Sequence, residues 1–267
     1  MEKLDALENE SIYIIREAYF KFKKIALLWS IGKDSTTLLW LCHKAFFGKI
    51  PFPVMHIDTT FKFPEMYAFR DKYAKEFGLD LLVEKNKKAL EAGISYETHD
   101  AFTCCHELKT NALMQAIQKY GFEALLVGIR RDEHGIRAKE RYFSPRNKAF
   151  EWNYENQPTE LWDHYQNNTN SSQHMRVHPL LHWTELDIWE YVKRENMPVN
   201  ELYFAHNGKR YRSLGCRAIT TSMESNASTV DEIIAEIKIS KIAERSGRKQ
   251  DKEQANMMQK LRALGYM

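Results

Sequence analysis

The sequence predicts an α/β fold, in which helices flank a mostly parallel sheet of about five strands and a C-terminal extension covers one sheet edge. Short apolar runs, the length of buried strands, alternate with longer segments whose apolar residues recur at helical spacing. Proline and glycine stand where those helical segments should begin and end. Polar residues follow the first, second and fourth apolar runs, at the sheet edge where α/β proteins bind ligands.

The N-terminal half of the chain alternates strand and helix after an opening amphipathic helix. Its third helix is bounded by Pro64, which suits a first helical turn, and by Gly78, which suits a helix end. The predicted elements are a helix over 5–22, a strand over 25–29, a helix over 34–46, a strand over 53–59, a helix over 63–77 and a strand over 79–83. Such alternation implies right-handed crossovers between parallel strands.

The middle of the chain continues this pattern and then loses it. A helix over 110–120 should end at Gly121, and a buried strand over 124–128 follows. The segment 144–174 shows no clear period, and its polar run 166–172 predicts a surface loop.

Two later helices are predicted from their N-terminal caps. Thr184 precedes a stretch with helical periodicity, and Asp187, three residues later, completes a capping box. The predicted helix 229–245 begins at a threonine in the same way. We expect residues 1–200 to form the main domain and residues 201–267 to form a segment that covers the ligand edge.

Composition excludes several classes of protein. The 267 residues are 43% hydrophobic and 28% charged, as in an ordinary soluble protein. A net charge of +3 is too small to indicate a nucleic-acid partner, and no apolar run approaches the roughly 18 residues of a membrane span. The charged N-terminus lacks the apolar core of a signal peptide, and four cysteines do not make a disulfide scaffold. We therefore expect a cytoplasmic protein with reduced cysteines.

The most informative segment, Ser-Ile-Gly-Lys-Asp-Ser at residues 30–35, lies between the first predicted strand and its helix. A tight turn there directs backbone N–H groups outward at the positive end of a helix dipole. Lys33 adds a charge, and Ser30 and Ser35 add hydroxyl groups. The loop predicts a phosphate cradle, although the Walker pattern is absent. An ordinary turn is the weaker interpretation, because strand, turn and helix start all agree.

Basic residues gather just after the fourth predicted strand. A guanidinium presents paired donors that match the oxygens of sulfate, phosphate or carboxylate, so we expect these side chains to bind an anionic substrate. The other interpretation is a solvated surface that Asp132, Glu133 and Glu140 balance. The residues predicted to bind the substrate are Arg131, Arg137, Arg141 and Arg212.

Several motifs together resemble those of one family. They occupy residues 30–35, 56–59, 130–133, 137–141, 183–189 and 213–216. They resemble the PP-loop ATP pyrophosphatases, and among these the family that joins the small, catalytic subunit of bacterial sulfate adenylyltransferase with the phosphoadenylyl-sulfate reductases. The resemblance covers nearly the whole chain and implies an adenine-nucleotide alpha hydrolase-like fold.

The same resemblance implies a reaction. PP-loop enzymes use ATP with Mg²⁺, cleave it between the α- and β-phosphates, and hand AMP to a substrate oxygen. Such catalysis relies on positioning and charge neutralisation, which gives Lys33 and Asp34 catalytic roles. The residues implied to bind ATP are Ser30, Gly32, Lys33, Asp34, Ser35, Thr36, His56, Asp58 and Gly128.

The cysteines depart from the pattern of a sulfate-activating subunit. Residues 103–110, with adjacent Cys104 and Cys105, resemble a segment of the adenylyl-sulfate reductases. In those enzymes this segment and a later Cys-x-x-Cys bind a [4Fe-4S] cluster. Cys216 matches the first cysteine of the later pair, but Ile219 replaces the second. No cysteine follows Cys216 to act as a nucleophile, so a reductase is not expected.

The three cysteines favour thiolation as the main function. Thiolating PP-loop enzymes adenylate an oxo group, here of a nucleobase or nucleotide as in 6-thioguanine-type synthases, and replace it with sulfur from a cysteine. Cys105 precedes a predicted helix and has Lys109 one turn later, which favours its thiolate. Cys105 would carry the sulfur, with Cys104 and Cys216 assisting or binding a [4Fe-4S] cluster. A cysteine desulfurase or another sulfur donor would be the partner.

Three other hypotheses stay open. The clustered cysteines could be small buried apolar residues, as Cys42 is expected to be within its core helix. The chain could be the small subunit of a sulfate adenylyltransferase, which makes adenylyl sulfate from ATP and sulfate with a GTPase large subunit. It could also be a nucleotide sensor without catalysis. Whole-chain resemblance favours sulfate activation, whereas the cysteines and the short connection from Tyr203 to Arg212 favour thiolation.

Overall fold

A six-stranded sheet in the order β3-β2-β1-β4-β6-β5 forms the centre of the protein. The computed structural model describes residues 2–153, 157, 159–160, 174–242, 244–247 and 264. The strands are β1 (Ile25–Leu28), β2 (Val54–Ile57), β3 (Leu81–Glu84), β4 (Ala124–Val127), β5 (Phe143–Arg146) and β6 (His174–Val177). Neighbouring strands are parallel except at the β5–β6 edge, which is antiparallel.

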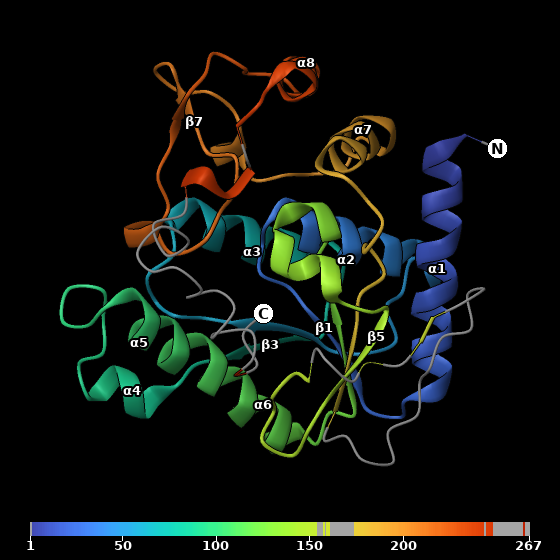
Figure 1. The fold of residues 1–267 in the computed structure, drawn as a ribbon, viewed down its shortest axis with the longest axis vertical. Coiled ribbons are helices and arrows are strands. Elements are labelled where there is room, and N and C mark those ends of the chain that lie inside the picture. Colours follow the sequence, from blue (N-terminus) through green and yellow to red (C-terminus); the bar gives the residue numbers. More distant parts are fainter. Residues whose placement is uncertain are drawn as a thin grey trace.

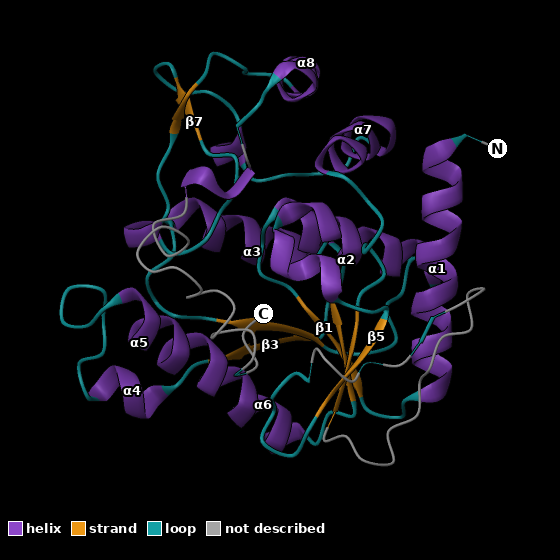
Figure 2. Ribbon diagram, viewed as in Figure 1, coloured by secondary structure: helices purple, strands orange, loops and turns teal. Residues whose placement is uncertain are grey.

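Helices cover both faces of this sheet (Figure 1). They are α1 (Lys3–Lys21), α2 (Lys33–Ala45), α3 (Pro64–Glu76), α4 (Lys87–Glu91), α5 (Ala101–Cys105), α6 (Ala112–Tyr120), α7 (Glu185–Glu195) and α8 (Val230–Ile239). Figure 2 shows α7 and α8 next to each other, on the side of the molecule away from α4, α5 and α6. A short ribbon pairs β7 (Lys209–Arg210) with β8 (Met223–Glu224). No helix in the described part of the chain is long and apolar enough to cross a membrane.

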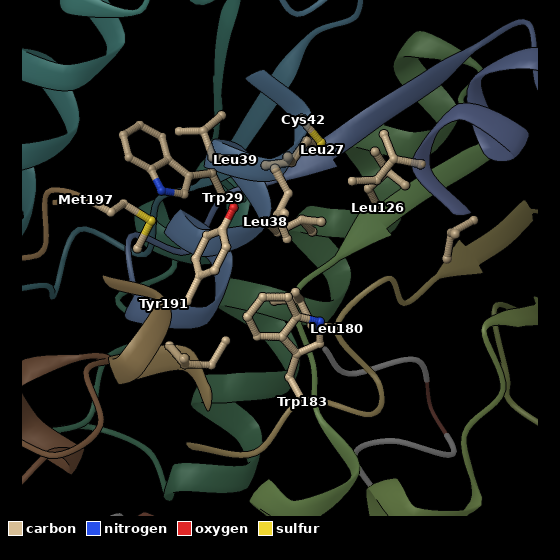
Figure 3. Close-up of a cluster of buried hydrophobic side chains, with 14 of the residues drawn as sticks. Leu27, Trp29, Leu38, Leu39, Cys42, Leu126, Leu180, Trp183, Tyr191 and Met197 are labelled. Carbon is tan, nitrogen blue, oxygen red and sulfur yellow. The ribbon is translucent and has the colours of Figure 1, made fainter. Parts of the chain in front are cut away.

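Successive residues of the strands pack into two different hydrophobic clusters. In β1, Leu27 joins a cluster with α1, α2 and α7, whereas Leu28 joins one with α6. Leu126 and Val127 of β4 divide between the clusters in the same way. This alternation is expected of strands that are buried on both faces. Cys42 is fully buried in the first cluster (Figure 3), which confirms the packing role expected for it.

The predicted fold class is confirmed, and so are the four predicted strands and the helices between them. The prediction missed β5 and β6, which bound the aperiodic segment 144–174. Strand β6 was missed because two of its four residues, His174 and Arg176, are polar and yet buried, so the segment does not read as an apolar strand. The predicted loop 166–172 lies outside the described residues.

The capping box predicted at Thr184 is present, and the helix cap predicted at Thr229 is a capping box as well. In each, the threonine side chain accepts a hydrogen bond from the backbone three residues later, and the acidic side chain there accepts one from the threonine backbone. Helix α8, predicted over 229–245, ends at Ile239, because Ser240 takes an extended conformation. The chain can therefore return to the sheet edge, where Glu244 lies in a short 3₁₀ helix.

Candidate active site

The loop between β1 and α2 is the centre of the site. Ile31 takes a left-handed backbone conformation (φ 69°) that turns the chain between strand and helix. Gly32 is the N-cap of α2, with an ordinary φ of −78°, and it has no side chain that could cap the helix. The hydroxyl oxygens of Ser30 and Ser35 lie 3.0 Å apart across the turn. A helix start whose N-cap residue is a glycine, beside two hydroxyl groups, has the form expected of a phosphate cradle.

Gly128, directly after β4, allows the sheet to approach this loop closely. A Cβ atom at this position would lie 3.0 Å from the carbonyl oxygen of Asp34 and 3.0 Å from backbone atoms of Ser35. Carbon atoms in ordinary contact need about 3.5–4.0 Å. Only a glycine therefore lets the end of β4 rest against the first turn of α2.

Two buried cations and their acidic partners dominate the electrostatics of the loop. Arg130 Nε donates to Asp34 Oδ1 at 2.6 Å, and the same guanidinium contacts Asp132 and Glu244. Lys33 lies 3.4 Å from Asp34 and is also paired with Glu244. Burial opposes the charge on Lys33, but these two acids outweigh burial and raise its pKa. The pKa of Arg130 is raised by the same balance, so both side chains are cations at neutral pH.

Glu244 reaches the loop from the C-terminal segment. It belongs to the 3₁₀ helix Glu244–Gly247 and is only 8% exposed. The next residue, Arg245, donates to Glu133 at 2.9 Å, and Glu133 is also paired with Arg137. Two consecutive side chains therefore attach the C-terminal segment to the loop that follows β4.

One cavity joins the phosphate loop to residues from several other segments. It offers about 140 Å³, roughly ten times the ~10–15 Å³ that a single water needs, so polyatomic anions fit in it. Its lining residues among those predicted to bind ATP are Ser30, Gly32, Lys33, Asp34, Ser35 and Gly128. From the C-terminal segment it is lined by Tyr203, Ser213, Leu214, Gly215, Cys216 and Arg245.

The other three residues predicted to bind ATP do not line this cavity. Thr36 Oγ1 accepts a hydrogen bond from the indole of Trp29 at 3.1 Å. The His56 ring lies 2.8 Å from the Trp29 carbonyl oxygen, and burial holds its pKa well below the usual range. Asp58 pairs with Lys85 at 2.9 Å; burial opposes its charge, but this lysine prevails and lowers its pKa to about 2. The contacts of all three are with neighbouring protein groups.

Of the four arginines predicted to bind the substrate, Arg137 lines the cavity. Arg212 instead donates to the carboxylate of Glu185 at 2.6–3.1 Å. Arg131 and Arg141 contact backbone carbonyl groups of the segment after β4. The structure therefore brings only Arg137 of these four arginines to the cavity, where it is paired with Glu133.

The three cysteines predicted to act in catalysis come together around one tyrosine. The hydroxyl of Tyr96 lies 3.4 Å from Cys105 Sγ, and it also interacts with Cys104 and Cys216. All three thiols are buried, and Cys216 is the one that lines the cavity. Thr59 Oγ1 lies 3.2 Å from Cys216 Sγ.

This arrangement does not fit an iron–sulfur cluster. A three-cysteine [4Fe-4S] cluster would need the space among the thiols, but the Tyr96 hydroxyl lies there, and Ile219 stands where a fourth ligand would be. Burial raises the pKa of Cys104 to about 12, so its thiol is protonated in this arrangement. Within the described residues, no group of three or more His, Cys, Asp or Glu side chains is placed to hold a metal ion.

Three residues of the site belong to no motif. Tyr203 accepts a hydrogen bond from the backbone N–H of Lys33 at 2.8 Å. Lys62 lines the cavity from the segment after β2. Glu244 falls inside the predicted helix 229–245. No sequence feature near it distinguishes it from an exposed glutamate on the surface of such a helix. All three are brought to the loop by tertiary packing.

A family model described as phosphoadenosine phosphosulfate reductase domain matches residues 24–222. Proteins named sulfate adenylyltransferase subunit 2 are similar along the whole chain. The one from Shewanella pealeana is 43% identical over 296 residues, which cover 100% of this chain and 98% of that protein. The one from Pseudomonas aeruginosa is 42% identical over 297 residues, which cover 98% and 97%.

Two solved structures show the same fold. Phosphoadenylyl-sulfate reductase from Candida auris superposes with a TM-score of 0.57 at 18% identity, covering 83% of this chain and 98% of that one. Yeast FAD synthetase superposes with a TM-score of 0.55 at 18% identity, covering 93% and 92%. At such identity these structures establish the fold alone.

The full-length relatives correct the main functional hypothesis. The prediction of thiolation of a nucleobase or nucleotide, which was inferred from the cysteines, is wrong. The prediction of a cysteine desulfurase as partner depended on it and is therefore withdrawn. Relatives at 42–43% identity over the whole chain are named for sulfate activation, which was the alternative. Because the family model also matches most of the residues, the chain belongs to the phosphoadenosine phosphosulfate reductase domain family and is an enzyme of the PP-loop ATP pyrophosphatase type.

Proposed function

We propose that this chain is the adenylyl-transferring subunit of a sulfate adenylyltransferase, which converts ATP and sulfate into adenylyl sulfate and pyrophosphate. The observation that carries the proposal is the full-length similarity to proteins named sulfate adenylyltransferase subunit 2. The geometry supports it, because the phosphate loop opens into a cavity with cations from several segments. Sulfate activation also needs no thiol, which agrees with three cysteines buried around a tyrosine.

The loop suits the leaving pyrophosphate of this reaction. Ser30, Gly32 and Ser35 would bind its oxygens through hydroxyl groups and the start of α2. Lys33 and Arg130 would neutralise the charge that accumulates as the bond to the α-phosphorus breaks. These interactions grow stronger as the reaction proceeds, so they accelerate the step instead of only binding ATP.

Mg²⁺ fits the acidic side of the same loop. The ion usually arrives with nucleotide phosphates and takes one or two protein carboxylates. Asp34 and Glu133 both line the cavity, and their carboxylates, now paired with Arg130 and Arg137, would supply these ligands. Bound there, Mg²⁺ would supply further charge neutralisation on the phosphates.

We also propose that residues 1–200 form the PP-loop domain and residues 201–267 form a segment over the active site. Tyr203 and Arg245 support this division, since both line the cavity from that segment. The partner would be a large GTPase subunit. The relatives are named as one subunit of an enzyme, and the formation of adenylyl sulfate is strongly uphill, so coupling to GTP hydrolysis would drive it.

The test is product analysis with the chain and a large subunit from the same organism, using radiolabelled ATP, sulfate and GTP. We expect adenylyl sulfate and pyrophosphate in equal amounts. Asp34→Asn should reduce the rate at least 100-fold, because it removes a charge from the loop, while the exposed-residue control Asp71→Asn should leave it unchanged. ADP as the nucleotide product, or a fully active Asp34→Asn enzyme, would contradict the proposal.

A further inference from the structure

We propose that Lys62 and Lys109 bind the acceptor sulfate, and that they form a second anion subsite in the cavity that holds the phosphate loop. This inference rests on the proposed function, which supplies the tetrahedral dianion as a substrate. Both lysines line the cavity, and neither belongs to a motif that the sequence singled out for ATP or for an anionic substrate.

The two lysines reach the cavity from separate elements. Lys62 lies just after β2, where its backbone forms an antiparallel bridge with Cys216 and so holds it against the C-terminal segment. Lys109 comes from His106–Asn111, a π-helical segment between α5 and α6. Such segments are rare and often mark functional sites, because the extra residue redirects side chains. Here the segment turns Lys109 into the same cavity that Lys62 lines.

Lys62 forms no ion pair with a carboxylate within 4.0 Å in the described part of the chain. Lys109 and Arg70 act against its charge. The Cys216 thiol acts in its favour, and so does Asp58, which is already paired with Lys85 at 2.9 Å. Burial of such a cation is costly, and it lowers the pKa of Lys62 to about 8. A dianion in the cavity would offset both lysine charges.

The lysine pair forms a positive centre distinct from the phosphate loop. The charges that act most strongly on Lys33 are the acids Asp34 and Glu244. The charges that act on Lys62 belong to different residues, namely Cys216, Lys109, Asp58 and Arg70. In adenylyl transfer, the attacking oxygen and the leaving oxygen stand on opposite sides of the phosphorus. Because Lys33 and the lysine pair both line one cavity, each could bind one of the two reacting anions.

The two lysines would bind sulfate, which is the nucleophile of the reaction. A sulfate oxygen forms a new bond to the α-phosphorus, and the bond from that phosphorus to the bridging oxygen breaks. The electron pair of the broken bond leaves with pyrophosphate, so no proton, reductant or oxidant is consumed. Because sulfate and the triphosphate repel each other, ammonium groups at the sulfate would lower the cost of bringing them together.

Cys216 is the competing partner for the two lysines. Burial opposes ionisation of its thiol, but Lys109, Thr59 and Lys62 outweigh burial and lower its pKa. If the lysines served the thiolate instead of sulfate, Cys216→Ser would weaken sulfate use as strongly as loss of a lysine. We expect Cys216→Ser to leave sulfate affinity within threefold, because sulfate itself would then be the partner of the lysines.

The decisive experiment measures binding of radiolabelled sulfate to the full chain saturated with a nonhydrolysable ATP analogue. Lys62→Gln and Lys109→Gln should each weaken sulfate binding at least tenfold and leave the affinity for the ATP analogue within twofold. Lys62→Arg keeps the charge and should retain most of the binding. Lys193→Gln, which alters an exposed lysine of α7, is the matched control and should change neither affinity.

The outcomes separate this inference from the proposed function. Unchanged sulfate binding in both glutamine variants would overturn the subsite, and so would equal losses of sulfate and ATP-analogue affinity. If sulfate binds to the lysines but the wild-type enzyme with its large subunit forms no adenylyl sulfate, the subsite stands and the proposed function fails. If adenylyl sulfate forms with the same KM for sulfate in wild type and variants, the function stands and the subsite fails.

Discussion

The carboxylate of Glu244 is paired with the ammonium group of Lys33, which precedes it by 211 residues in the chain. Arg130 contacts the same carboxylate, and all three side chains are buried. Burial opposes ionisation of Glu244, but the two cations outweigh burial and lower its pKa. A charged carboxylate therefore lies where the proposed function needs the oxygens of pyrophosphate, and the two anions should compete for the same cations.

Glu244→Gln should bind pyrophosphate more tightly than the wild-type protein, because the competing charge is gone. The unliganded variant should be less stable by about 3–5 kcal/mol, since breaking a buried ion pair leaves Lys33 and Arg130 less compensated. The measurement is the thermal unfolding midpoint with and without pyrophosphate. We expect a larger increase on ligand addition in the variant.

The matched control is Glu224→Gln, which changes an exposed glutamate paired with Lys209. It should leave both the midpoint and the response to pyrophosphate at wild-type values. An equal response in Glu244→Gln and wild type would show that this carboxylate does not compete with the phosphates.

Gly128→Ala should disrupt the phosphate loop from the sheet side. The added Cβ would lie 3.0 Å from backbone atoms of Asp34 and Ser35, so the start of α2 must move. We expect a stability loss of about 1–3 kcal/mol and a loss of ATP affinity of at least tenfold, measured by equilibrium binding. Gly135→Ala is the control, because a Cβ there meets nothing within 4 Å. Wild-type ATP affinity in Gly128→Ala would mean that this close approach is dispensable.

The parts of the site that could be predicted from the sequence are local ones. The phosphate loop is encoded by consecutive residues, since the buried strand, the turn and the helix start follow one another at 25–46. The pairing of Lys33 with Glu244 had no such signal, because it depends on where the chain returns after Ser240 breaks the last helix. The missed strand β6 likewise depends on tertiary burial of polar residues such as Arg176.

The cysteines show a different limit of sequence interpretation. The structure does place Cys104, Cys105 and Cys216 together, as the pattern implied. However, the positions of the three cysteines in the sequence indicate only which chemistry thiols permit. They do not indicate whether the space among the thiols is open to a substrate or a cluster. Here the hydroxyl of Tyr96 lies among the three thiols, so the same cluster is packed protein instead of a sulfur-relay site.

Cys105→Ser should therefore leave adenylyl sulfate formation within about threefold of the wild-type rate. Its Sγ contacts Tyr96 at 3.4 Å and Lys109 at 3.8 Å, and a serine hydroxyl can keep polar contacts of this kind. The stability cost should be about 1 kcal/mol, as for a typical point mutant. The measurement is the initial rate of adenylyl sulfate formation together with a denaturation curve. Complete loss of activity in a folded variant would return a catalytic role to this thiol.

The KM for sulfate should rise with pH once Lys62 loses its proton. Burial is the main cause that lowers the pKa of Lys62 to about 8; Lys109 and Arg70 lower it further, while Cys216 and Asp58 act in the opposite direction. The charged form, which the proposed subsite needs, predominates below that pH and is lost above it. KM for sulfate should thus be flat to about pH 7.5 and then rise by about tenfold per pH unit, with the KM for ATP as an internal reference. Lys62→Arg stays charged and should remove the rise, whereas an unchanged pH profile in that variant would assign the titration to another group.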